Sequence, residues 1–295
     1  MSKSIPNIST MKALYDYIRS QVVETVGEAE AGSIAHIILD HHWHATRTDV
    51  VLQKPVKFSP DDNEKLSDII ARIKKNEPIQ YILGKAHFLG RDFFVSPQVL
   101  IPRPETEELV QLIIVENPEP GKVVLDVGTG SGCIAISLQK QMVNAEVFAI
   151  DFDASVLDIA AENARHHQAC VHFLQVDVLQ EKIYLPLQDI IVSNPPYVTN
   201  KEAKQMHSNV LEYEPQTALF VPDEDPLLFY RHITGHALEL LAVGGKLYFE
   251  INEAYGAAVA ALLKQHHFFQ VKILHDMQGK DRMVCGTLQP PGFTI

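Results

Sequence analysis

Short apolar runs alternate with amphipathic segments after residue 105, and this alternation constrains the fold more than any other feature of the sequence. The runs that we predict as strands are residues 123–127, 146–150, 171–176, 189–193 and 246–251. Because parallel strands are joined through helical crossovers, the pattern favours an α/β fold with helices on both faces of a mostly parallel sheet. Two final segments, residues 269–274 and 283–288, are expected to close the sheet as a hairpin.

The first part of the chain has a different pattern. Residues 10–83 carry apolar side chains at helical spacing without alternating strand runs, so we predict a small helical domain over residues 1–84. Within it, Ser59 followed by Pro60 is typical of a helix start. Residues 85–104 then change to spaced apolar positions around two turns, which predicts a β-hairpin linker. Residues 105–295 form the larger predicted domain.

The composition is that of an ordinary globular protein, with 46% hydrophobic and 21% charged residues. The formal net charge of −12 disfavours duplex nucleic acid as the main partner, because proteins that bind it usually present a basic face to the phosphates. The sequence contains no run of about 18 apolar residues that would span a bilayer. Charged residues interrupt the apolar positions near the N-terminus, unlike in a signal peptide, so we expect a cytoplasmic protein without a membrane anchor.

Neither the cysteines nor the histidines predict a metal site. The three cysteines lie far apart in the sequence and lack the paired spacing of zinc ligands. His41, His42 and His44 follow Asp40 closely, but adjacent residues of a helix point in different directions. A helix end at the surface is the favoured interpretation of this cluster.

The first predicted strand of the larger domain runs into a glycine loop and then into a helix that begins near Cys133. Glycines in such a loop allow tight turns and a close approach of the backbone to a ligand. The spacing is Gly-x-Gly-x-Gly, and Cys133 stands where the dinucleotide-binding fingerprint has its third glycine. We therefore predict S-adenosyl-L-methionine rather than NAD as the cofactor. The predicted cofactor-binding residues of this segment are Asp126, Gly128, Thr129, Gly130, Ser131 and Gly132.

Two acidic residues follow the next predicted strands. Asp151 ends the second strand, at a distance from the glycine loop that suits a carboxylate accepting hydrogen bonds from ribose hydroxyls. Asp177 follows the third strand, and together with the adjacent Val178 it is a candidate for the adenine end of the cofactor. Both acids are expected at the carboxyl edge of the sheet.

The fourth predicted strand ends in Asn194-Pro195-Pro196-Tyr197, where an open parallel sheet places its ligand crevice. Two prolines fix the backbone and remove two N–H donors, so carbonyl oxygens remain as acceptors. The Asn194 side-chain oxygen and the Pro195 carbonyl are predicted to accept both hydrogens of a planar NH₂ group, while Tyr197 packs against its plane. All four residues are predicted to be catalytic, and Asn194 is also a predicted cofactor contact.

An amide nitrogen is a poor nucleophile, because its lone pair is delocalised into the carbonyl group. Polarising both N–H bonds returns electron density to the nitrogen. The site must then hold this atom about 3–3.5 Å from the sulfonium methyl group. Neither a metal ion nor a covalent intermediate is required, so the tetrapeptide predicts direct methyl transfer to a planar nitrogen.

Several motifs resemble those of the HemK/PrmC family, the glutamine N5-methyltransferases of peptide chain release factors. The matching stretches are residues 80–84, 88–91, 100–107, 126–133, 192–197, 214–215 and 279–282. The resemblance extends from about Pro78 to the end of the chain, and it is most specific at residues 101–106 and 193–197.

This resemblance implies a class I S-adenosylmethionine-dependent methyltransferase domain, with a seven-stranded, mostly parallel doubly wound sheet, and an N-terminal helical bundle that docks the substrate. It implies methylation of the side-chain amide nitrogen of the glutamine in the Gly-Gly-Gln loop of release factors. No direct contact with nucleic acid is expected, and without a heptad run we expect a monomer. The acidic, glycine-free segment 220–226 and Asn252 depart from the family pattern, and both are expected to lie away from the methyl-transfer centre.

Other functions remain open from the sequence. A glutamine methyltransferase of a ribosomal protein shares the tetrapeptide, although residues 101–106 favour the release-factor enzymes. Nucleic-acid adenine N6-methyltransferases present the same acceptors to an exocyclic NH₂ group after base flipping, but the acidic charge and the absence of an obvious basic recognition segment count against them. A cofactor-binding scaffold without catalysis is the non-enzymatic alternative, and the intact Asn194 and Asp151 argue against it.

Overall fold

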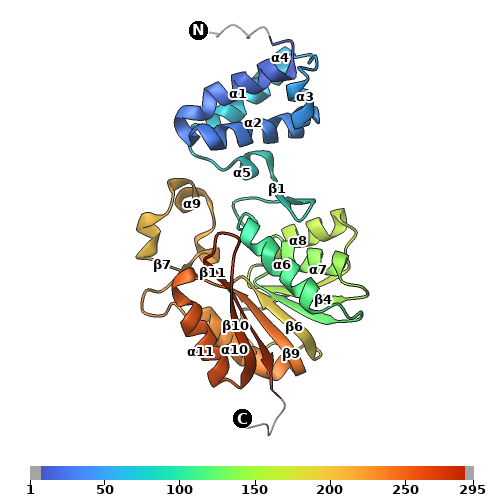
Figure 1. The fold of residues 1–295 in the computed structure, drawn as a ribbon, viewed down its shortest axis with the longest axis vertical. Coiled ribbons are helices and arrows are strands. Elements are labelled where there is room, and N and C mark those ends of the chain that lie inside the picture. Colours follow the sequence, from blue (N-terminus) through green and yellow to red (C-terminus); the bar gives the residue numbers. More distant parts are fainter. Residues whose placement is uncertain (1–7, 290–295) are drawn as a thin grey trace. The chain divides into compact units, whose positions relative to one another are not determined.

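A computed structural model describes residues 8–289, which form two compact units (Figure 1). The smaller unit comprises the described residues up to Gly84 together with His207–Tyr213. The larger unit comprises Lys85–Met206 and the residues from Glu214 onward. The segment His207–Tyr213 therefore belongs to the smaller unit, although the chain reaches it from within the larger one.

The smaller unit is helical. Its helices are α1 (Met11–Val26), α2 (Glu28–Trp43), α3 (Arg47–Val51), α4 (Pro60–Ile73), α5 (Ile79–Leu83) and α9 (Ser208–Tyr213). Apolar residues three or four positions apart, such as Leu14 and Ile18 in α1, form the buried face of each long helix. The Ser59 side chain accepts a hydrogen bond from the Asp62 N–H and the Asp62 carboxylate accepts one from the Ser59 N–H, so a capping box starts α4.

A seven-stranded sheet forms the centre of the larger unit. Its strands are β3 (Val123–Val127), β4 (Glu146–Asp151), β5 (Val171–Gln175), β6 (Gln188–Ser193), β9 (Leu241–Glu250), β10 (Phe268–His275) and β11 (Asp281–Leu288). Their order across the sheet is β10-β11-β9-β6-β3-β4-β5. The five strands from β9 to β5 are parallel, and the β10–β11 hairpin joins β9 antiparallel. The predicted mostly parallel sheet with a closing hairpin is confirmed.

Helices cover both faces of this sheet (Figure 1). The helices on one face are α6 (Pro104–Glu116), α7 (Cys133–Gln141) and α8 (Ala154–His166), and those on the other are α10 (Leu228–Leu240) and α11 (Gly256–Gln265). Val124 packs into the first of these cores and Leu125 into the second, because successive strand residues point to opposite faces. None of the helices in the described part of the chain has the length and apolar character that a membrane span needs.

Smaller elements flank the sheet. The hairpin strands β1 (Lys85–Phe88) and β2 (Arg91–Phe94) pair antiparallel. After β6 the chain forms β7 (Val198–Thr199), η1 (Glu202–Gln205), η2 (Gln216–Ala218) and β8 (Phe220–Val221), and η3 (Glu253–Tyr255) follows β9. Strands β7 and β8 pair in parallel.

The chain changes direction across the sheet at β3. From β3 it proceeds to β4 and β5 on one side, and it returns to the other side of β3 with β6. In open parallel sheets such a switch of direction leaves a crevice at the carboxyl ends of the strands. The loops after β3, β4 and β6 meet at this edge.

Candidate active site

A cavity with an empty volume of about 1020 Å³, part of it open to solvent, lies at the carboxyl ends of β3, β4 and β6. The predicted site residues on its wall are Gly128, Thr129, Gly130, Ser131, Asp151, Asp177, Val178, Asn194, Pro195 and Pro196. Three other predicted site residues, Asp126, Gly132 and Tyr197, are not part of the wall that the described residues form. The structure thus brings most of the predicted residues together around one space.

The glycine loop adopts a conformation that favours glycine. Gly128, Gly130 and Gly132 have φ angles of 74°, 54° and 80°. A Cβ atom added at Gly128 or Gly130 would have no atom within 4 Å, so open space lies beside the loop backbone. At Gly132 the same atom would lie 3.0 Å from Ile136 Cδ1 and 3.2 Å from Ala160 Cβ. Gly132 therefore permits close packing of the loop rather than contact with a ligand.

Asp126 lies within the protein, behind the loop. Its Oδ2 atom accepts hydrogen bonds from the Thr129 hydroxyl at 2.7 Å and from the Ala135 N–H at 3.2 Å. Burial raises the pKa of this carboxyl group to about 7. The predicted direct cofactor contact of Asp126 is not supported by this position, and its side chain instead joins the loop to the start of α7.

Asp151 joins the ends of two neighbouring strands. Its Oδ2 atom accepts a hydrogen bond from the Gly130 N–H at 3.0 Å, and burial raises the pKa of its carboxyl group. Asp177 follows β5, where its Oδ1 atom accepts from the Leu179 N–H at 2.9 Å. Asp151 and Asp177 thus place two carboxylates on the same wall, where they offer acceptors for hydroxyl or amino groups.

These residues fit S-adenosyl-L-methionine. The open space beside Gly128 and Gly130 allows a ligand to approach the backbone closely. Asp151 supplies a largely buried acceptor for sugar hydroxyls, while Phe152 and Val178 supply apolar surface for a flat base. Polar groups placed on a mostly apolar wall are typical of cofactor sites.

The side chain of Asn194 is held from behind by α6. Its Nδ2 atom donates to the Thr106 hydroxyl oxygen at 3.2 Å. Thr106 in turn donates to Glu250 Oε2 at 2.6 Å. Sequence reasoning did not single out Thr106 or Glu250 as site residues, although Thr106 ends the specific motif at residues 101–106. The amide of Asn194 is therefore not free to rotate.

The hydroxyl of Tyr197 contacts a buried carboxyl group. It donates to Glu250 Oε1 at 3.2 Å, and burial raises the pKa of this hydroxyl, so it stays neutral. The Tyr197 backbone N–H donates to the Leu219 carbonyl at 3.2 Å. Tyr197 is not part of the wall that the described residues form, and its packing against the substrate plane stays a prediction.

The two departures from the family pattern, expected away from the methyl-transfer centre, lie next to the tetrapeptide. Asn252 Nδ2 donates to the Tyr197 carbonyl at 3.3 Å and to Glu202 Oε1 at 3.0 Å. Phe220, the first residue of the acidic segment, pairs with Val198 directly after the tetrapeptide. Asn252 reaches this place because β6 and β9 are neighbours that end at the same edge, whereas Phe220 reaches it through the pairing of β8 with β7.

A buried ion pair closes another part of the wall. Arg103 Nη2 lies 2.5 Å from Glu214 Oε1, and Glu214 Oε2 also accepts a hydrogen bond from the Ile101 N–H at 3.3 Å. The Glu214 side chain is almost fully buried, whereas Arg103 lines the cavity. The pair attaches the segment before α6 to residues far along the chain.

Comparison with known proteins gives matches over most of the chain. Residues 106–217 match the family described as the methyltransferase small domain, and residues 19–84 match the PrmC N-terminal domain. A protein of Bacteroides thetaiotaomicron named release factor glutamine methyltransferase is 46% identical over 275 residues, covering 93% of this chain and 99% of that protein. Proteins of the same name from Flavobacterium psychrophilum and Bacillus subtilis are 44% and 34% identical, covering 90% and 94% of this chain and 96% and 99% of their own lengths.

Among solved structures, a methyltransferase from Pyrococcus furiosus has a TM-score of 0.52 at 19% identity, covering 76% of this chain and 100% of that chain. A similarity at this level of identity concerns the fold. Together with the strand order, it confirms the predicted class I methyltransferase fold.

Proposed function

The chain belongs to the family of release factor glutamine methyltransferases, and on this premise we propose that it methylates the side-chain amide nitrogen (N5) of the glutamine in the Gly-Gly-Gln motif of peptide chain release factors. The observation that carries the proposal is the position of Asn194 and Pro195 on the same cavity wall as the glycine loop and Asp151. Acceptors for a planar NH₂ group thus lie beside the cofactor site.

S-adenosyl-L-methionine, the cofactor of this enzyme class, supplies an electrophilic methyl group on a positively charged sulfur. Asp151 is proposed to bind the ribose hydroxyls, and Asp177 with Val178 the adenine end. The backbone at Gly128 and Gly130 accommodates the part of the cofactor that approaches the loop. These residues would hold the bound cofactor in the same cavity as the end of β6.

The substrate amide is activated by hydrogen bonds. Asn194 Oδ1 and the Pro195 carbonyl accept its two N–H hydrogens, which increases the electron density on nitrogen and fixes the plane of the amide. The wall residues would hold the nitrogen close to the methyl group that the bound cofactor supplies. The proton that the nitrogen loses on methylation would pass to solvent through the open part of the cavity.

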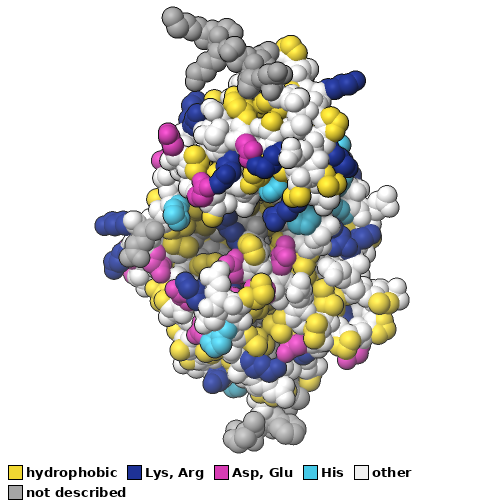
Figure 2. Space-filling model, turned by 45° about the horizontal axis from the view of Figure 1, so that its top comes forward, with side chains coloured by type: hydrophobic (Ala, Val, Ile, Leu, Met, Phe, Trp, Pro, Cys, Tyr) yellow, Lys and Arg dark blue, Asp and Glu magenta, His cyan; other side chains and the backbone are white. Residues whose placement is uncertain are grey.

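The residues of the smaller unit up to 84 are proposed to dock the release factor. The match of residues 19–84 to the PrmC N-terminal domain supports this role. A direct role for nucleic acid is not part of the proposal, and on the face drawn in Figure 2 Lys and Arg side chains are interspersed with acidic and hydrophobic ones. A monomeric, cytoplasmic enzyme completes the proposal.

The experiment that tests this function uses labelled S-adenosyl-L-methionine, the purified protein and a release factor, with mass spectrometry to locate the label. A matched release factor with the loop glutamine replaced by alanine is the control. Methyl on that glutamine, absent from the control, is the expected result. Label on a ribosomal protein or on adenine of a nucleic acid, with none on the loop glutamine, would contradict the proposed substrate.

A further inference from the structure

A chain of hydrogen-bonded side chains leads from the cavity wall into the core. Asn194 at the end of β6 donates from Nδ2 to the Thr106 hydroxyl at 3.2 Å, and Thr106 in the first turn of α6 donates to Glu250 Oε2 at 2.6 Å. Thr106 and Glu250 are 3% and 1% exposed. Water therefore does not compete strongly for these bonds. Through Thr106, the buried carboxyl group of Glu250 is linked to the Asn194 amide on the cavity wall.

The direction of each hydrogen bond follows from the two hydroxyl groups that Glu250 contacts. Its Oε2 atom accepts from Thr106 and its Oε1 atom from Tyr197, so Thr106 uses its single hydroxyl proton on Glu250. Thr106 can then only accept a hydrogen bond from Asn194. The group of Asn194 that faces Thr106 must therefore be its NH₂, and Oδ1 is the atom left for the other side of the amide.

Both oxygens of Glu250 have hydrogen-bond partners. Burial raises the pKa of Glu250, and the hydrogen bonds from Thr106 and Tyr197 and the positive charge of Arg282 only partly oppose this rise. The neighbouring carboxylate of Glu105 opposes them weakly. Four groups from α6, the segment after β6 and β11 thus act on the pKa of Glu250.

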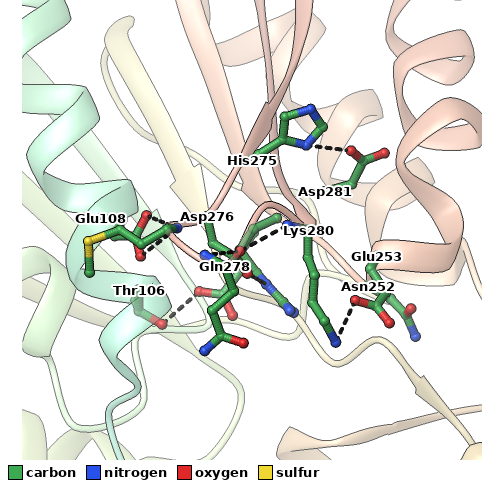
Figure 3. Close-up of polar contacts among 12 residues, drawn as sticks. Thr106, Glu108, Asn252, Glu253, His275, Asp276, Gln278, Lys280 and Asp281 are labelled. Carbon is green, nitrogen blue, oxygen red and sulfur yellow. Dashed lines mark hydrogen bonds and ion pairs between the residues drawn. The ribbon is translucent and has the colours of Figure 1, made fainter.

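Arg282 is itself anchored by the turn between β10 and β11. Its Nε atom lies 3.2 Å from Asp276 Oδ2, and the Asp276 side chain is almost completely buried. The Asp276 carboxylate also accepts from the N–H groups of Gln278 and Lys280 at 2.9 and 3.0 Å. Figure 3 shows Asp276 and Gln278 of this turn beside Glu108 and Thr106 of α6. The turn thus fixes the position of Arg282, whose positive charge acts on Glu250.

We propose that Glu250 and Thr106 are positioning residues that decide which atom of the Asn194 amide faces the substrate glutamine. This inference rests on the proposed function, in which Asn194 Oδ1 accepts a substrate N–H. Without an acceptor-only group at position 250, Thr106 can donate to Asn194 Oδ1 instead. The Asn194 amide then turns its NH₂ toward the substrate NH₂, and two donors face each other.

Thr106→Val tests this relay, because valine has nearly the same shape but lacks the hydroxyl. We expect kcat to fall on the order of 10²-fold, as for other losses of reactant alignment, with little change in the KM for release factor or in the Kd for the cofactor measured by calorimetry. Thr106→Ser restores the hydroxyl and should recover most of kcat. Thr234→Val is the matched control, since it removes a buried hydroxyl that bonds only within its own helix to the Tyr230 carbonyl.

Glu250→Gln provides the second test. The glutamine amide can donate to the Thr106 hydroxyl, which can then donate to Asn194 Oδ1. The preferred orientation of the Asn194 amide is lost, so kcat should fall while cofactor binding is retained. Wild-type kcat in either Thr106→Val or Glu250→Gln, or no recovery in Thr106→Ser, would overturn the relay. If Thr106→Val fails to bind the cofactor, the kcat of Glu250→Gln tests the relay by the same criteria. A wild-type enzyme that does not methylate the loop glutamine would instead reject the proposed function, so the two failures are distinguishable.

Discussion

The backbone N–H of Gly130 donates a hydrogen bond to Asp151 Oδ2 at 3.0 Å, which joins the loop after β3 to the end of β4. Asp151 is 8% exposed and lines the cavity, so the same carboxylate holds the loop and faces the cofactor site. Substitutions at Asp151 should therefore affect both the position of the loop and the acceptor that we propose for the ribose hydroxyls.

Asp151→Ala and Asp151→Asn should separate these two effects. Asparagine keeps an oxygen for the Gly130 N–H but loses the charge, whereas alanine loses both. A lost hydrogen bond to a charged group costs about 1.5–3 kcal/mol, so Asp151→Ala should raise the Kd for the cofactor roughly 10- to 100-fold, and Asp151→Asn less. Titration calorimetry measures both values. An unchanged Kd in Asp151→Ala would remove Asp151 from the cofactor site.

Asn194→Ala should abolish most methyl transfer while leaving cofactor binding largely in place. The variant lacks the oxygen that polarises a substrate N–H, and removal of one such preorganised hydrogen-bonding group typically lowers kcat about 10²- to 10³-fold. Single-turnover kinetics with a release factor gives the rate, and calorimetry confirms that the variant binds the cofactor. Undiminished turnover would exclude the proposed activation of the amide.

The buried carboxyl group of Asp126 should make stability depend on pH. Its pKa is raised by burial to about 7 in the folded protein, compared with 3.8 as the ordinary value. The folded state therefore binds this proton more tightly than the unfolded chain does. The resulting stabilisation is fully present below about pH 4 and is lost as the pH rises through 7.

Asp126→Asn isolates this contribution. Asp126 Oδ1 has no hydrogen-bond partner among the described residues, so an asparagine NH₂ can take its place while the other oxygen keeps Thr129 and Ala135 as donors. Between pH 5 and pH 8 the wild type should lose about 2–3 kcal/mol of unfolding free energy relative to Asp126→Asn. Urea unfolding at both pH values measures the difference. Parallel pH profiles would show that Asp126 titrates as an ordinary carboxylate.

Gly132→Ala should destabilise the larger unit more than Gly90→Ala. Both glycines have positive φ angles, which cost an alanine roughly 1–2 kcal/mol. An added Cβ has no atom within 4 Å at Gly90, but at Gly132 it would crowd Ile136 and Ala160 and cost about 1–3 kcal/mol more. Thermal unfolding compares the two variants. Equal midpoints would indicate that α7 and α8 move apart without cost.

The fold and the composition of the cavity wall could be predicted from sequence because they depend on local patterns. Buried strands show apolar runs, a glycine loop follows the first of them, and Asn194-Pro195 follows the fourth. The carboxyl ends of parallel strands share one edge, so these residues meet. The start of β9 was less predictable. Gly244 and Gly245 interrupt its apolar pattern, yet the strand begins at Leu241.

The sequence by itself thus determined the class of fold, the edge that carries the site and ten of the residues on its wall. Only the tertiary structure decided which residues hold Asn194 in place on that wall. Thr106 and Glu250 are 144 positions apart and meet because α6 packs across the sheet next to the end of β9. Tyr197 turns toward the same carboxylate, and Asn252 reaches the tetrapeptide from the neighbouring strand. Such contacts depend on strand order and helix packing, and no local periodicity or motif spacing encodes them.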